Sequence, residues 1–135
     1  MKMIKQKPLA NGEVAMDCGV CTIAMLGDLS YERVLTDNPD YRGMTDRYWM
    51  HYLKLLGFQV EEEDENEPPT GMRLYCGVTG QKDGVTIVHA IAVDECGHIF
   101  DPANGAPEPG KHTLKECVDF GTFTIRCCFS IREKP

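Results

Sequence analysis

The amino-acid sequence predicts an α+β fold in which N-terminal helices pack on an antiparallel β-sheet. Up to residue 57, apolar residues recur at helical spacing between capping residues and glycines. From residue 72 onward they alternate with a period of two, in segments separated by turns. Helices followed by strands in this order favour a layer of helices against one face of the sheet. Because 135 residues match one ordinary domain, residues 1–135 are expected to form a single unit.

Three helices are expected in the first part of the chain. The first covers about residues 18–26, with Asp17 as its N-cap and Gly27 at its end. A shorter helix follows the capping residue Ser30 in SYERVL. The third, in TDRYWMHYLKLLG, begins after Thr45, and its apolar residues fall at positions i, i+3, i+4 and i+7: Trp49, Tyr52, Leu53 and Leu56.

Strand patterns dominate the rest of the chain. FQVEE predicts a strand that runs into the acidic, solvent-exposed loop EEEDENEPP. MRLYCGVT and VTIVHAIAVD predict two strands joined by the turn GQKDG, and HIFD predicts a short strand after a second turn. TLKECVDFG predicts a short helix capped by Thr113, and TFTIRCCFSIRE predicts a final strand. The alternation is expected to place two sets of residues each on one face of a strand: Val85, Ile87, His89, Ile91 and Val93, and then Phe123, Ile125, Cys127, Phe129 and Ile131.

Charge and composition exclude several classes of protein. The net charge is −7 and the pI about 5.0, without the basic stripe that a nucleic acid or an anionic membrane surface attracts. No apolar run approaches the roughly 20 residues of a membrane-spanning helix, and the lysine-containing N-terminus lacks the apolar core of a signal peptide. The seven cysteines are therefore expected to be reduced thiols in the cytoplasm, and most of them to fill the core.

Two cysteines in DCGVCTIAML suit nucleophilic chemistry. A nucleophilic cysteine needs a favoured thiolate, a base within reach and a group that orients the base. Cys18 is expected at the first helical position, where unpaired N–H groups and the helix macrodipole favour negative charge. Cys21 lies one turn later, where this effect is weaker.

A base and its orienting group are candidates further along the chain. His89 lies within the apolar run TIVHAIAV, where a histidine can equally be a hydrogen-bonded core residue. Asp101, in IFDPANG, follows one short hairpin later and is expected beside His89, where it would fix the imidazole tautomer. An aspartate before proline also commonly begins a turn, so both interpretations stay open at this point.

The ordered set DCGVCTIAM, HAIAV and DPANG resembles the papain-like cysteine peptidases. The nearest pattern is the compact bacterial and phage type similar to the C39 bacteriocin-processing peptidases, and the resemblance covers roughly residues 6–105. It implies a papain-like fold with Cys18 as nucleophile, His89 as base and Asp101 as orienting group. Cys21 is a rival nucleophile, because larger papain-like enzymes use the second cysteine of a C-G-x-C run.

The resemblance also implies an oxyanion hole that this chain departs from. Family members carry a glutamine shortly before the cysteine, and here that position is Gly12. Gln6, further upstream, is the expected amide donor, with Asn11 as its rival. The implied reaction attacks a peptide, isopeptide or other amide bond of a peptide or protein substrate, without a cofactor. The resulting thioester can then be hydrolysed or passed to another acceptor.

Three other interpretations compete with the hydrolase. Cys18 and Cys21 have the spacing of a zinc knuckle, and Cys96 and His98 are possible further ligands, although a second knuckle is missing and no metal is expected. A thioredoxin-type redox pair needs a preceding strand that the sequence does not predict. A papain-like binding protein without activity keeps the fold and loses the reaction. The oligomeric state is left open.

Overall fold

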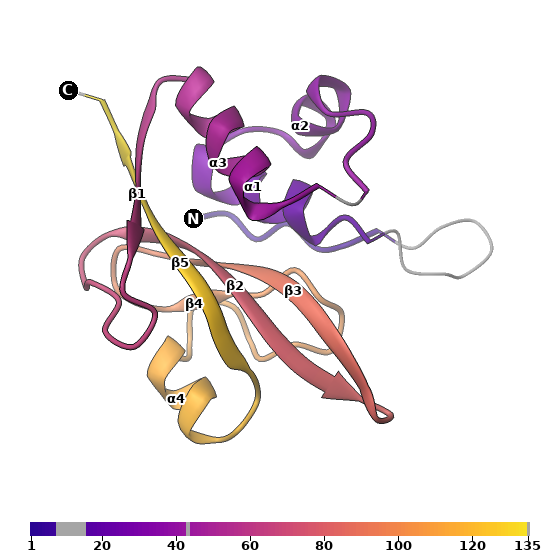
Figure 1. Ribbon diagram of the computed structural model, residues 1–135, viewed down its shortest axis with the longest axis vertical. Coiled ribbons are helices and arrows are strands. Elements are labelled where there is room, and N and C mark those ends of the chain that lie inside the picture. Colours follow the sequence, from indigo (N-terminus) through magenta and orange to yellow (C-terminus); the bar gives the residue numbers. More distant parts are fainter. Residues whose placement is uncertain (8–15, 43, 135) are drawn as a thin grey trace.

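The computed structural model describes residues 1–7, 16–42 and 44–134, and this part of the chain has an α+β architecture with a curled, five-stranded antiparallel sheet. The strands lie in the order β1-β5-β2-β3-β4, so that the C-terminal strand β5 is inserted between β1 and β2 (Figure 1). The elements along the chain are α1 (Cys18–Gly27), α2 (Tyr31–Asp37), α3 (Asp46–Leu55), β1 (Phe58–Glu63), β2 (Arg73–Lys82), β3 (Val85–Val93), β4 (Ile99–Phe100), α4 (Leu114–Asp119) and β5 (Thr124–Glu133).

Helices cover both faces of the sheet, whereas the sequence predicted helices on one face only. The N-terminal helices α1, α2 and α3 gather on one side as expected, and α4 lies on the other (Figure 1). The reason lies in the strands, whose second face is also apolar. Leu114 and Cys117 of α4 pack there against Cys76, Ile91 and Cys128, all three of which are inaccessible to solvent.

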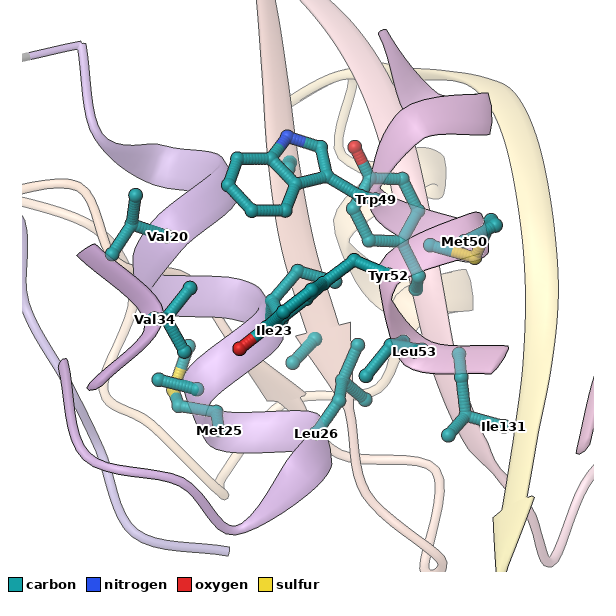
Figure 2. Close-up of a cluster of buried hydrophobic side chains, with 14 of the residues drawn as sticks. Val20, Ile23, Met25, Leu26, Val34, Trp49, Met50, Tyr52, Leu53 and Ile131 are labelled. Carbon is teal, nitrogen blue, oxygen red and sulfur yellow. The ribbon is translucent and has the colours of Figure 1, made fainter. Parts of the chain in front are cut away.

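The larger core holds the start of α1 in place. Figure 2 shows Trp49 and Leu53 of α3 lying against α1 near Ile23 and Leu26. Trp49 is 3 % exposed, and its indole ring lies so close to Gly19 that an added Cβ there would stand 2.5 Å from Nε1. Only glycine fits at that distance, so α3 and the first turn of α1 make direct contact next to Cys18.

The cap residues of three helices are those predicted. Ser30, Thr45 and Thr113 each accept a backbone N–H with their side-chain oxygen, and Thr113 forms a capping box with Glu116. Helix α1 ends at Gly27, as predicted, and Gly27 is its last helical residue. Asp28 (φ 52°) takes the left-handed position after it, and its N–H bonds to the Ala24 carbonyl.

The hairpin between β2 and β3 is tighter than GQKDG suggested. The strands extend to Lys82 and Val85, which leaves Asp83 and Gly84 as the loop. Both loop residues have positive φ, 53° and 77°, as in the two-residue turns whose twist matches that of paired strands. This end of the hairpin projects beyond the helices (Figure 1), and Val85 and Val88 are exposed there.

A β-bulge overturns the prediction that five alternate residues of the last strand share a face. Gly77 of β2 pairs with Cys127, but the next residue, Val78, pairs with Ile125, so Arg126 is an extra residue in β5. The inserted residue reverses the alternation. Phe123 and Ile125 consequently pack with the core beneath α4, whereas three residues after the bulge pack with the core of the N-terminal helices: Cys127, Phe129 and Ile131.

Candidate functional site

Cys18 is the first residue of α1 and is partly exposed. A side-chain hydrogen bond fastens this helix to the sheet: Thr22 Oγ1 donates to the Ala90 carbonyl over 3.1 Å. That carbonyl belongs to a part of β3 that β4 leaves uncovered, since β4 pairs with Ala92 and Val93. Because Thr22 lies one turn after Cys18 and Ala90 directly follows His89, the bond sets the thiol and the imidazole side by side.

His89 and Asp101 form a short hydrogen bond. Nε2 of the ring lies 2.6 Å from Oδ1 of the carboxylate, and the two side chains are 16 % and 12 % exposed. The backbone N–H of Ala103 donates to the same carboxylate oxygen over 2.9 Å, so the turn after β4 fixes the carboxylate. With Nε2 engaged, Nδ1 is the ring nitrogen left for the thiol of Cys18.

The surroundings of His89 favour its charged form. Burial alone lowers the pKa of the ring, but the hydrogen bonds to Asp101 and to the Cys18 thiol, together with the charges of these groups, raise the pKa from 6.5 to about 9. The site therefore favours a protonated ring more than water does. Asp101 and Cys18 act on the same imidazole, so the three side chains form one electrostatic unit.

Cys21, the rival nucleophile, lies in a different environment. Its side chain, within α1, is buried and inaccessible to solvent. Burial, followed by the charges of Asp17 and Cys18, raises the pKa of its thiol far above the ordinary value. The thiol of Cys18, in contrast, acts on the ring of His89 and helps to raise its pKa. The arrangement of donors and charges thus favours Cys18 for nucleophilic chemistry.

Asp17 lies at the N-cap position of α1, as predicted, but it does not act as a side-chain cap. It precedes the helix, but its side chain makes no capping bond. Its Oδ2 instead accepts the hydroxyl of Tyr31 over 2.6 Å and the backbone N–H of Lys7 over 3.3 Å. The carboxylate is fully buried, and its Oδ1 has no partner among the described residues. Tyr31 and Lys7 are far apart in sequence, so no local pattern could indicate this arrangement.

Gln6 lies beside the residue that follows Asp101. Its backbone N–H donates to the Pro102 carbonyl over 2.8 Å, and the residue is partly buried. The N-terminal segment therefore passes close to Asp101. Asn11, the rival amide donor, and Gly12 lie outside the described residues.

The other cysteines are free and distributed over the fold. Cys127 and Cys128 point to opposite faces of β5, as two adjacent strand residues must. Cys128 Sγ lies 3.5 Å from Cys76 Sγ, and the two residues are paired across β5 and β2. Within the described ranges, no three His, Cys, Asp or Glu side chains are grouped to hold a metal ion.

Comparison with protein-family models, with curated proteins and with solved structures gives no significant match. Among the helices that the structure describes, none is long and apolar enough to cross a bilayer.

Proposed function

We propose that this chain is a papain-like cysteine hydrolase that cleaves a peptide, isopeptide or other amide bond through Cys18, His89 and Asp101. One observation carries the proposal: a single imidazole interacts with the thiol at the start of α1 and with a carboxylate 2.6 Å from its Nε2. Thiol, base and orienting group are the three parts that a cysteine hydrolase requires. The residues, and the order in which they occur along the chain, also match those of the family that the sequence resembles.

The chemistry follows from the protonation of His89. The ring takes the thiol proton of Cys18, which gives a thiolate–imidazolium pair, and Asp101 stabilises the positive ring. The thiolate attacks the carbonyl carbon of the scissile bond, and an oxyanion forms. When this intermediate collapses, the C–N bond breaks and the imidazolium gives its proton to the leaving amine. Water, activated by the now neutral His89, then attacks the thioester and releases the acid.

The oxyanion requires at least two hydrogen-bond donors. We assign one to the backbone N–H of Cys18, which the helix leaves free at its first position. The second is the side-chain amide of Gln6, because its backbone is already held next to the loop of Asp101. Removal of one such donor typically costs about 10²–10³ in rate.

The substrate class follows from the same chemistry. An acyl-enzyme of this kind can form from a peptide or protein amide, without a metal or a cofactor, and an amine can replace water as its acceptor. All seven cysteines are free, which suits a reducing compartment, and we propose the cytoplasm.

Labelling with iodoacetamide at limiting concentration tests the proposal. The thiol of Cys18 should react at least about tenfold faster than any other thiol, because only this thiol is paired with an imidazolium. Tryptic mapping identifies the labelled residue, and Cys21→Ala should label at the wild-type rate. Fast labelling that survives Cys18→Ala would contradict the assignment. A protein without any fast thiol would be a papain-like binder without activity.

A further inference from the structure

Residues 3–7 form an N-terminal strap across the seam between the helices and the sheet. Met3 and Ile4 pack, partly buried, against the core of the N-terminal helices. Two consecutive backbone N–H groups of the strap then form hydrogen bonds. That of Gln6 donates to the carbonyl of Pro102, which follows Asp101, and that of Lys7 donates to the carboxylate of Asp17, which precedes Cys18. The strap therefore connects the residues that adjoin the nucleophile and the orienting carboxylate.

Lys7 fixes the strap to α2 as well. Its Nζ lies over the ring of Tyr31, 4.8 Å from the ring centre, and 4.0 Å from Oε1 of Glu32. The hydroxyl of the same Tyr31 donates to Asp17. Both side-chain contacts are weak on the surface, so the buried carboxylate of Asp17 is the strongest anchor of this end of the strap.

The position of Asp17 is costly for a purely structural residue. A fully buried carboxylate loses its hydration, and helix capping does not explain it, because the side chain makes no capping bond. No ion pair of Asp17 occurs within the residues that the structure describes. What the carboxylate does is bind the strap and Tyr31 with a single oxygen.

We infer that Asp17 is a positioning residue: its carboxylate holds the strap against the start of α1 and so keeps the amide of Gln6 in the oxyanion hole. This inference rests on the proposed function. It implies that the two reactions of Cys18 depend differently on Asp17. Acylation passes through an oxyanion and needs the strap. Alkylation by iodoacetamide forms an S–C bond and releases iodide without an oxyanion, so it needs the thiolate alone.

The experiment compares these two rates in the full chain. p-Nitrophenyl acetate acetylates the thiol and releases p-nitrophenolate, which gives the acylation rate; iodoacetamide gives the alkylation rate. Asp17→Ala should lower acylation of Cys18 about 10–10²-fold and leave alkylation within about threefold. Asp17→Asn should restore acylation to within about threefold, because its carbonyl oxygen can accept the same two hydrogen bonds. Tyr31→Phe removes one of the two donors to Asp17, so its acylation rate should lie between those of Asp17→Ala and Asp17→Asn.

A matched control is Asp37→Ala. Asp37 accepts the hydroxyl of Tyr52 over 2.7 Å, in a tyrosine–carboxylate bond of the same kind without a link to the strap. It should change neither rate beyond about twofold. An equal fall of acylation and alkylation in Asp17→Ala, or unchanged acylation, would overturn the inference.

Hydrogen exchange separates this inference from the proposed function. The N–H groups of Gln6 and Lys7 should exchange at least about tenfold faster in Asp17→Ala than in the wild type, whether or not the protein acylates. Tyr31→Phe keeps this measurement available if Asp17→Ala does not fold. Unchanged exchange at both amides would show that Asp17 does not hold the strap. A wild type that alkylates fast but does not acylate at Cys18 would contradict the proposed function.

Discussion

Two thiol–carboxylate clusters have their thiols, Cys18 and Cys127, packed against the core of the N-terminal helices, and only one of the two clusters contains an imidazole. In the triad, His89 stands between Cys18 and Asp101. In the Asp46 cluster, formed by Asp46, Tyr75 and Cys127, no base intervenes: Cys127 Sγ donates to Oδ2 of Asp46 over 3.3 Å, and the hydroxyl of Tyr75 donates to Oδ1 over 2.6 Å.

The difference shows what a neighbouring carboxylate does to a thiol. In the Asp46 cluster, burial first and then the hydrogen bond to Asp46 raise the pKa of Cys127 to about 12, so the thiol keeps its proton. In the triad the carboxylate acts on the imidazole and raises the pKa of that ring instead. A carboxylate thus suppresses a thiolate that it touches directly and supports one that it reaches through a base.

The largest expected effect separates the two thiols. Cys18→Ala should lower acylation by p-nitrophenyl acetate by about 10³-fold or more, because the nucleophile is lost. In Cys127→Ala the acylation rate should stay within about twofold of the wild-type rate, since the thiol of Cys127 is protonated and hydrogen-bonded to Asp46. A burst assay measures both. Comparable losses in the two variants would erase the distinction between the clusters.

The next effect concerns the two carboxylates. Asp101→Asn should lower acylation roughly 10²–10⁴-fold, because an amide neither fixes the required tautomer nor stabilises the imidazolium. It should also lower the pKa of His89, so that the basic limb of the pH profile, expected near 9 in the wild type, moves down. Asp46→Asn should leave the profile in place. The rate of Cys18 acylation by p-nitrophenyl acetate, measured from pH 5 to 10, provides the check.

Folding stability should depend on pH in two separate windows. The pKa of His89 is higher in the folded protein, about 9, than the ordinary 6.5, so the bound proton stabilises the fold fully below pH 6.5 and this contribution is lost as the pH rises to 9. The loss amounts to up to about 3 kcal/mol. The raised pKa of Cys127 contributes in the same direction, but only above about pH 9.

Urea unfolding at pH 6 and pH 9 measures the first window. In His89→Gln the stability should change little between these two values, since the titrating group is absent. A wild type as stable at pH 9 as at pH 6 would refute the raised pKa of the ring.

The smallest expected effect comes from crowding the Asp46 cluster. A Cβ at Gly77 would lie 2.7 Å from Cys127 Sγ, so Gly77→Ala should push the thiol away from Asp46 and destabilise the fold by about 1–2 kcal/mol. Alkylation of Cys18 should not change. Gly19→Ala crowds Trp49 next to Cys18 and should alter that alkylation rate as well. Thermal unfolding measures the stability of both variants, and iodoacetamide labelling measures their rates of Cys18 alkylation.

Local patterns were sufficient for most of the elements. Thr45 and Thr113 cap helices as predicted, because a cap bond joins residues three positions apart. The same local rule was wrong for Asp17, where Tyr31 and the N–H of Lys7 compete for the carboxylate from 14 and 10 residues away. The alternation in β5 was wrong beyond Arg126, because a bulge depends on the partner strand.

The sequence by itself determined that Cys18 begins a helix, that His89 lies in a strand and that Asp101 begins a turn, because each depends on neighbours within a few residues. Only the tertiary structure decided that these three side chains meet. Their distances depend on the order of the strands, on the bond from Thr22 to Ala90 and on the contact between Trp49 and Gly19. Such contacts join residues far apart in the chain, and periodicity carries no information about which distant surfaces pack together.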